Sequence, residues 1–136
     1  MTRIAWEKRY EVGHPRIDHE HQVFVDLLRT VAEAAARAEP HERINRLLLE
    51  VHKYAEFHFI SEENIMIDAA FPDYERHRQE HGMLLAHFDR QLQQFRQGEL
   101  ELAQIADFMF DWFAMHTTRL DLRLGDFLRG EGIAAH

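Results

Sequence analysis

Histidines on apolar helical faces are the residues of this sequence with the clearest chemical potential. The chain carries eleven histidines and no cysteine, so any metal ligands must be nitrogen and oxygen donors. Helical spacing places six polar residues among the apolar ones: His21, His58, Glu62, His77, His81 and His116. His58 and Glu62 are four residues apart, as are His77 and His81, so each pair shares one helix face. We interpret the six as ligands of a metal site, which suits two ions better than one.

The alternative is that these histidines are structural. A single histidine on an apolar face is more often hydrogen-bonded to a nearby acceptor than bound to metal. Together, however, five imidazoles and a carboxylate would each need a polar partner, or lose about 1–3 kcal/mol through desolvation. The apolar faces offer too few such partners, and metal would satisfy the whole set. We read the other histidines as solvated or structural: His14, His19, His41, His52, His87 and His136.

Four amphipathic segments must position the six candidate ligands. Apolar residues recur every three or four positions and no period-two alternation is sustained, so the chain is predicted to be all-α. The expected helices span about 18–38, 41–69, 73–97 and 99–118, after an irregular arm 1–17 and before a short helical tail 119–136. Short connections favour an up-down-up-down antiparallel four-helix bundle. In such a bundle the six residues all fall at the same end.

Prolines and glycines mark the ends of these segments. Pro40 and Pro72 suit the first turn of a helix, and Gly98 suits a helix C-terminus. Gly82 lies within the third segment instead, where it costs about 1 kcal/mol relative to alanine. Close approach of a neighbouring helix would be one reason for a glycine there.

Length and composition limit the class of protein. With 136 residues, 46% of them hydrophobic, the chain suits one globular domain, 1–136. A formal net charge of −8 with scattered basic residues does not resemble a nucleic-acid-binding surface. No apolar run reaches membrane-spanning length, and the first residues lack the apolar core of a signal peptide. We therefore expect a cytoplasmic protein that neither binds nucleic acid nor inserts into membranes.

Four motifs, in order along the chain, resemble those of the hemerythrins, and more closely those of the bacterial hemerythrins. They are Asp18-x-x-His21, His58-Phe59-x-x-Glu62-Glu63, His77-x-x-x-His81 and His116-x4-Asp121. The arm residues Trp6, Tyr10, Gly13 and Ile17 also fit the entry segment of that family. The resemblance runs from about Trp6 to Leu128, nearly the whole chain.

This resemblance implies a hemerythrin-like domain with a non-haem di-iron centre. His77, His81 and His116 would hold one iron, and His21 and His58 would hold the other. Glu62 and Asp121 would bridge the two Fe²⁺/Fe³⁺ ions, together with an oxo or hydroxo group. The second iron would keep an open position, at which dioxygen binds.

Several large residues adjoin the candidate ligands in sequence. Phe24, Phe59, Trp112 and Phe113 are predicted to form a dry pocket over the open iron position. Thr117 follows His116, where the family resemblance suggests a large aliphatic residue. A threonine hydroxyl that faced the pocket would speed autoxidation.

The favoured function is reversible dioxygen binding, for oxygen storage, delivery or sensing, with no catalytic residue assigned. Dioxygen is then the ligand, and a separate oxygen-consuming protein is the expected partner. One alternative is a di-iron enzyme with peroxidase, nitric oxide reductase or oxidase activity; a weak peroxidase activity would also be compatible with a carrier. A second alternative is iron storage or repair.

Overall fold

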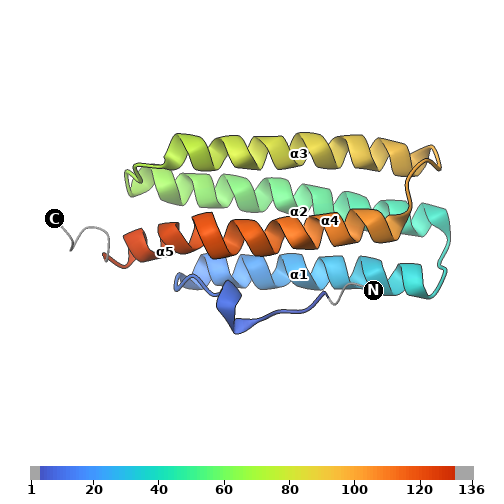
Figure 1. Ribbon diagram of the computed structural model, residues 1–136, viewed down its shortest axis with the longest axis horizontal. Helices are drawn as coiled ribbons and strands as arrows, with labels where there is room; N and C mark the ends of the chain where they lie inside the picture. The colour runs from blue at the N-terminus through green and yellow to red at the C-terminus, as the bar shows by residue number, and fades with distance from the viewer. Residues whose placement is uncertain (1–3, 131–136) are drawn as a thin grey trace.

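The computed structural model describes residues 4–130, and its main feature is a set of four long antiparallel helices (Figure 1). They are α1 (Pro15–Ala36), α2 (His41–Asp68), α3 (Tyr74–Arg96) and α4 (Leu102–His116). α1 packs against α2 and α4, and α3 packs against the same two helices. Residues 4–130 contain no strand. The predicted all-α, up-down-up-down bundle is therefore confirmed.

The helix starts differ from the expected ones by a few residues, for local reasons. α1 begins at Pro15 rather than at residue 18, because the Ile17 N–H donates to Nδ1 of His14 and so caps the helix. α4 begins at Leu102 rather than at residue 99, because Glu101 and Gln104 form a capping box there. Sequence periodicity locates the body of a helix, whereas these caps decide its first residue.

The three connections between the long helices begin with the same left-handed turn. Ala38, Ala70 and Gly98 have positive φ angles of 53°, 55° and 76°. In each turn, the residue after the one with positive φ donates its backbone N–H to a carbonyl five residues back. This Schellman pattern satisfies one of the last carbonyls of the helix. Gly98 thus follows a helix C-terminus as expected. Pro40 and Pro72, in contrast, precede α2 and α3 instead of lying in their first turns.

The chain does not leave its helical path after α4. A π-helical turn, η2 (Thr117–Asp121), continues directly into α5 (Leu122–Leu128), which ends the described chain near the start of α1 (Figure 1). The π-turn is defined by the Leu122 N–H, which donates to the Thr117 carbonyl five residues back. The expected helical tail is present, and this turn joins it to α4 without a break.

The N-terminal arm is fixed to the bundle at several points. It contains a short 3₁₀ helix, η1 (Lys8–Tyr10), whose Tyr10 ring is buried against Phe110 and Phe113. Farther along, the Asp18 carboxylate accepts hydrogen bonds from the backbone N–H groups of Val12 and Gly13. The expected arm residues 1–3 and tail residues 131–136, including His136, lie outside the described residues.

Two glycines of the bundle have contrasting surroundings. A Cβ on Gly125 would lie 2.0 Å from the Val12 carbonyl oxygen, so only glycine lets α5 approach the arm. A Cβ on Gly82 would meet no atom within 4 Å, so the expected close approach of a neighbouring helix at Gly82 is wrong.

The buried core is apolar at the end of the bundle where α1 ends and α4 begins. Residues such as Val31, Leu48, Leu92 and Ile105 are buried there in one cluster contributed by all four helices. None of the described helices is long and apolar enough to span a lipid bilayer. The polar buried residues gather at the opposite end, where α1 and α3 begin.

Candidate metal centre

Every predicted ligand lies at that opposite end of the bundle, and every one is buried. α1 contributes His21, α2 contributes His58 and Glu62, α3 contributes His77 and His81, α4 contributes His116, and η2 contributes Asp121. None of these seven residues is more than 5% exposed. Their donor atoms form two overlapping groups, each within 4.8 Å: Glu62, His77, His81, His116 and Asp121 in one, and His21, His58 and Glu62 in the other.

Glu62 lies between the two groups and turns one oxygen toward each. Its Oε1 is 2.8 Å from His77 Nε2 and 3.1 Å from His81 Nε2. Its Oε2 is 3.5 Å from His58 Nε2 and 3.7 Å from His21 Nε2. The carboxylate therefore faces a group of histidines on either side.

Asp121 repeats this arrangement from the other wall of the site. Its Oδ1 is 2.7 Å from His77 Nε2 and 2.9 Å from His116 Nε2. Its Oδ2 is 3.2 Å from His21 Nε2. Two carboxylates thus separate three histidines on one side from two on the other.

The π-turn explains how Asp121 reaches the site. In an α-helix, residues five apart point in directions about 140° apart, because each residue turns the helix by about 100°. In η2 the hydrogen bond spans five residues instead of four, so one extra residue fits into the turn. His116 and Asp121 consequently face the same side.

Several donor atoms are left without a hydrogen bond, although His77 Nε2 and Asp121 Oδ1 form one at 2.7 Å. Both Glu62 oxygens and His81 Nε2 are buried without a hydrogen bond of acceptable geometry, despite their short separations. The Nε2 atoms of His77 and His116 also face each other at 3.1 Å. Buried polar atoms are rarely left unpaired, whereas lone pairs that converge on shared points are what metal ions require. The donor set therefore fits metal binding.

The electrostatics of the cluster also favour a positive charge. Burial lowers the pKa of His21, but the nearby carboxylates of Asp121 and Glu62 outweigh this effect and raise the pKa to about 9. Burial likewise lowers the pKa of His77, and the same two carboxylates raise it to about 10. Burial raises the pKa values of Glu62 and Asp121, but the histidines hold both well below the usual range. The carboxylates stay ionised and attract either protons or metal ions.

Three glutamates outside the seven hold the far side of the imidazole rings. His58 Nδ1–H donates to Glu20 Oε1 at 2.7 Å, and His81 Nδ1–H donates to Glu63 Oε2 at 2.9 Å. His116 Nδ1 is 3.3 Å from Glu80 Oε1. Such carboxylate partners fix ring orientation and turn Nε2 toward a metal. The sequence interpretation assigned no role to these three glutamates.

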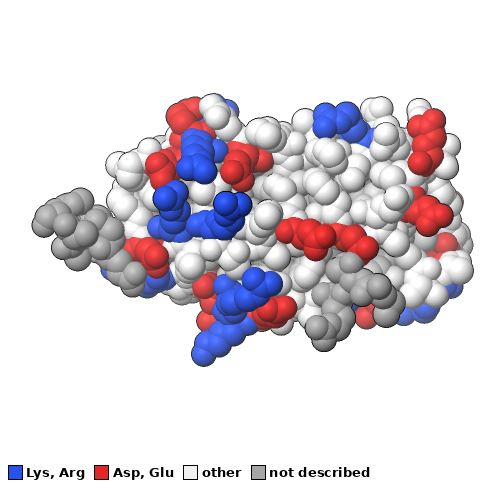
Figure 2. Space-filling view, viewed as in Figure 1, with Lys and Arg blue, Asp and Glu red and all other residues white. Residues whose placement is uncertain are grey.

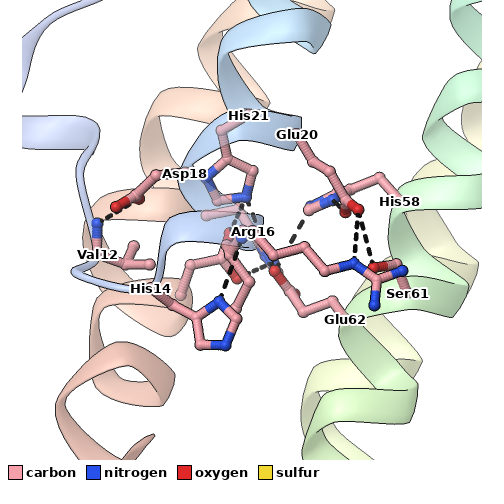
Figure 3. A network of polar contacts seen from close by, with 12 residues as sticks. Val12, His14, Arg16, Asp18, Glu20, His21, His58, Ser61 and Glu62 are labelled. Carbon is pink, nitrogen blue, oxygen red and sulfur yellow. Dashed lines mark hydrogen bonds and ion pairs between the residues drawn. The ribbon is translucent and has the colours of Figure 1, made fainter. Parts of the chain in front are cut away.

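Glu20 is the most buried of the three, and Figure 3 shows its carboxylate beside His58, Ser61 and Arg16. Its side chain is 7% exposed, and besides His58 it accepts hydrogen bonds from Ser61 Oγ at 3.0 Å and Arg16 Nε at 3.2 Å. Burial raises the pKa of Glu20, but the bonds from His58 and Ser61 outweigh it and lower the pKa. An ionised carboxylate therefore lies directly behind His58.

A small apolar cavity adjoins the two-histidine side. It has a volume of about 10 Å³, and its walls include His21, His58 and the four aromatic residues predicted for the pocket: Phe24, Phe59, Trp112 and Phe113. A space of this size holds about one water-sized molecule. Thr117 is buried too, but it does not line this cavity.

Aromatic rings also support the ligands directly. Phe59 stacks on His81 with ring centroids 3.9 Å apart, and Trp112 stacks on His116 at 4.4 Å. Phe113 meets His21 edge-on at 5.3 Å. The rings limit rotation of the imidazoles and place apolar surface beside them.

The other described histidines do not belong to the cluster. His52 is buried between α2 and α3, with Nε2 2.6 Å from Asp89. His41 and His87 stack on the rings of Phe95 and Phe108, and His14 caps α1.

Bundle and site together define a class: four-helix proteins that bind metal between buried histidines and carboxylates. Residues 12–128 match the family of the hemerythrin HHE cation-binding domain, and the chain belongs to this family. Family membership and the His/Glu/Asp cluster point to a non-haem di-iron site.

The relatives of this chain extend over most of its length. The bacteriohemerythrin of Methylococcus capsulatus is 30% identical over 129 residues, which cover 94% of this chain and 96% of that protein. The bacteriohemerythrin of Ralstonia nicotianae is 28% identical over 134 residues, covering 97% and 93%. A crystal structure of wild-type hemerythrin has the same fold, with a TM-score of 0.83 at 24% identity over 89% of this chain and 94% of that one.

Proposed function

We propose that this protein binds dioxygen reversibly at a pair of iron ions. The observation that carries the proposal is the placement of Glu62 and Asp121, each with one oxygen toward the three-histidine side and one toward the two-histidine side. His77, His81 and His116 would hold one iron, His21 and His58 the other, and the two carboxylates would bridge them. The two-histidine iron would have fewer protein ligands and would face the small cavity.

A bound iron pair would supply the two electrons that dioxygen accepts reversibly. The chain itself supplies positioning and a dry environment. Glu62 and Asp121 keep the two histidine groups at fixed separation, and Glu20 holds the His58 ring through Nδ1. Phe24, Phe59 and Phe113 cover the open side with apolar surface.

The cavity walls favour binding over turnover. Among the described residues, the acid–base side chains that line the cavity are His21, His58, His116 and Asp121, all of them proposed ligands. A peroxidase or oxidase would need a proton donor beside the bound oxygen. Oxygen carriage therefore fits the site better than enzymatic use.

Metal analysis and optical spectroscopy test this function. The purified protein should contain two irons per chain, and its reduced form should gain a charge-transfer band in oxygen that disappears when oxygen is removed. His58→Ala should abolish the reversible band. His52→Ala is the matched control, because it removes a buried histidine of the same helix that lies outside the cluster. Fewer than two irons, or no reversible band, would contradict the proposal.

A further inference from the structure

A second and much larger concavity lies on the outer side of the metal centre. It has a volume of about 580 Å³ and lies between α3 on one side and α4, η2 and α5 on the other. Its lining includes three arginines, one glutamate, one tryptophan and one methionine: Arg76, Arg119, Arg123, Glu80, Trp112 and Met115. Figure 2 shows basic side chains gathered over this end of the molecule, where α3 begins and α5 lies. We call this concavity the arginine groove.

The arginines of the groove make few ion pairs among the described residues, although Arg76 interacts electrostatically with Glu80 and the chain as a whole has a formal net charge of −8. Within residues 4–130, neither Arg76 nor Arg119 forms an ion pair. Arg123 has only a 3.7 Å pair with Asp73 in which both side chains are more than half exposed, and such pairs contribute little. Glu80, the one acid in the lining, is already directed to His116 Nδ1. The groove thus presents three guanidinium groups with free hydrogen-bond donors.

Guanidinium groups of this kind recognise oxyanions. Each one offers planar paired donors that match phosphate or carboxylate oxygens, and three together suit a group with several oxygens and more than one negative charge. The volume lies within the range of small-molecule sites and exceeds the needs of a bare anion. Trp112, Met115 and Leu120 provide apolar surface for the remainder of the molecule. We propose that the arginine groove binds a small organic molecule bearing a phosphate group.

Trp112 and His116 line both the arginine groove and the small cavity. Trp112 stacks on the His116 ring with an angle of 14° between the planes, so the two residues form a shared wall. Glu80, which contacts His116, lies in the electrostatic field of Arg76. A phosphate in the groove would neutralise the positive charge of Arg76. It would also lie against the wall that Trp112 and His116 form between the groove and the small cavity. We expect occupancy to alter the optical spectrum of the iron-loaded protein, a consequence that rests on the proposed iron site, whereas the binding itself does not.

Isothermal titration of the iron-loaded protein tests the binding, with inorganic phosphate and phenyl phosphate as probes. Phenyl phosphate should bind saturably and more tightly than inorganic phosphate, because its ring can lie against Trp112 and Met115. R76Q/R119Q/R123Q should weaken phenyl phosphate binding at least about tenfold, since three charge-assisted contacts are lost. The matched control R46Q/R90Q/R96Q removes the same charge at the far end of α2 and α3, and should bind within about twofold of the unchanged protein.

Several results would overturn the proposal. They are the absence of saturable heat at millimolar phenyl phosphate, equal weakening in both triple variants, and unchanged affinity in the groove variant. Iron content and the thermal unfolding midpoint verify that each variant is intact. If the groove variant fails to fold, the single variants Arg76→Gln and Arg119→Gln replace it, because neither arginine has an ion pair within residues 4–130. If both single variants bind phenyl phosphate as tightly as the unchanged protein, the site is refuted. The titration is performed without oxygen, so its failure is separable from failure of dioxygen binding.

Discussion

Removal of the Glu20 carboxylate should weaken iron binding on the two-histidine side specifically. In Glu20→Ala, His58 Nδ1 and Ser61 Oγ lose their acceptor inside the protein. Each buried group left unpaired costs about 1–3 kcal/mol, so the folded metal-free protein should lose about 2–6 kcal/mol of stability. The bond from Arg16 adds little, because that side chain is 58% exposed.

Glu20→Gln separates the charge of this carboxylate from its geometry. The amide oxygen can still accept from His58 Nδ1–H, and the amide N–H group can donate to Ser61 Oγ in place of the present bond. Besides the exposed bond from Arg16, the loss is then the difference between a charge-assisted and a neutral hydrogen bond. That difference is about 1 kcal/mol. Glu20→Gln should therefore retain most of the stability and hold the second iron less tightly than the unchanged protein, but more tightly than Glu20→Ala.

Stepwise titration with ferrous iron under nitrogen, against a coloured chelator, measures the effect on each site. Loss of a carboxylate behind a ligand imidazole typically lowers metal affinity about 10–100-fold, and in Glu20→Ala this loss should appear in one of the two binding steps. Glu80→Ala is the matched control, because Glu80 contacts His116 and its removal should weaken the three-histidine step instead. Unchanged affinity of Glu20→Ala for both irons would show that Glu20 does not position the His58 ring for metal binding.

Three further substitutions or conditions test other parts of the structure. Gly82→Ala should stabilise the protein by up to about 1 kcal/mol in urea unfolding, because the added Cβ meets no atom and the helix gains propensity; destabilisation would reveal a contact that the structure lacks. Phe113→Ala should cost about 3–5 kcal/mol and speed loss of the reduced state in air, because it opens the cavity beside His21; an unchanged autoxidation rate would show that this ring does not exclude water. The carboxylates of Asp121 and Glu62 raise the folded-state pKa of His77 from the ordinary histidine value of 6.5 to about 10, so its contribution to metal-free stability is complete below about pH 6.5 and is lost as pH rises through 10. Urea unfolding of metal-free protein between pH 6.5 and 10 should show this decline, and a flat profile would contradict it.

Helix periodicity was sufficient to predict the bundle, because each long segment buries one apolar face. It could not predict the chain path after His116. An α-helical continuation would turn Asp121 away from the other ligands, and the extra residue in η2 corrects this direction. The sequence holds no periodic signal for a single π-turn, so Asp121 entered the predicted ligand set only through the family resemblance.

The positions of the three glutamates behind the proposed ligands, in contrast, could have been predicted from the sequence. Glu20 precedes His21, Glu63 follows Glu62, and Glu80 precedes His81. Neighbours in a helix point about 100° apart, so a glutamate beside a ligand faces the adjoining helix rather than the same metal. Each of the three indeed contacts a histidine of another helix.

These three glutamates change the expected charge of the site. The proposed ligands alone comprise five imidazoles and two carboxylates, which would supply less negative charge than carboxylate-rich di-iron sites. Glu20, Glu63 and Glu80 add three more carboxylates through the Nδ1 atoms of His58, His81 and His116, and so make those imidazoles stronger donors. Because these glutamates contact Nδ1, on the far side of each ring from the proposed metal, they occupy no coordination position. At the proposed di-iron site, the bundle would thereby stabilise two highly charged ions and still leave one face of the two-histidine side to the apolar cavity.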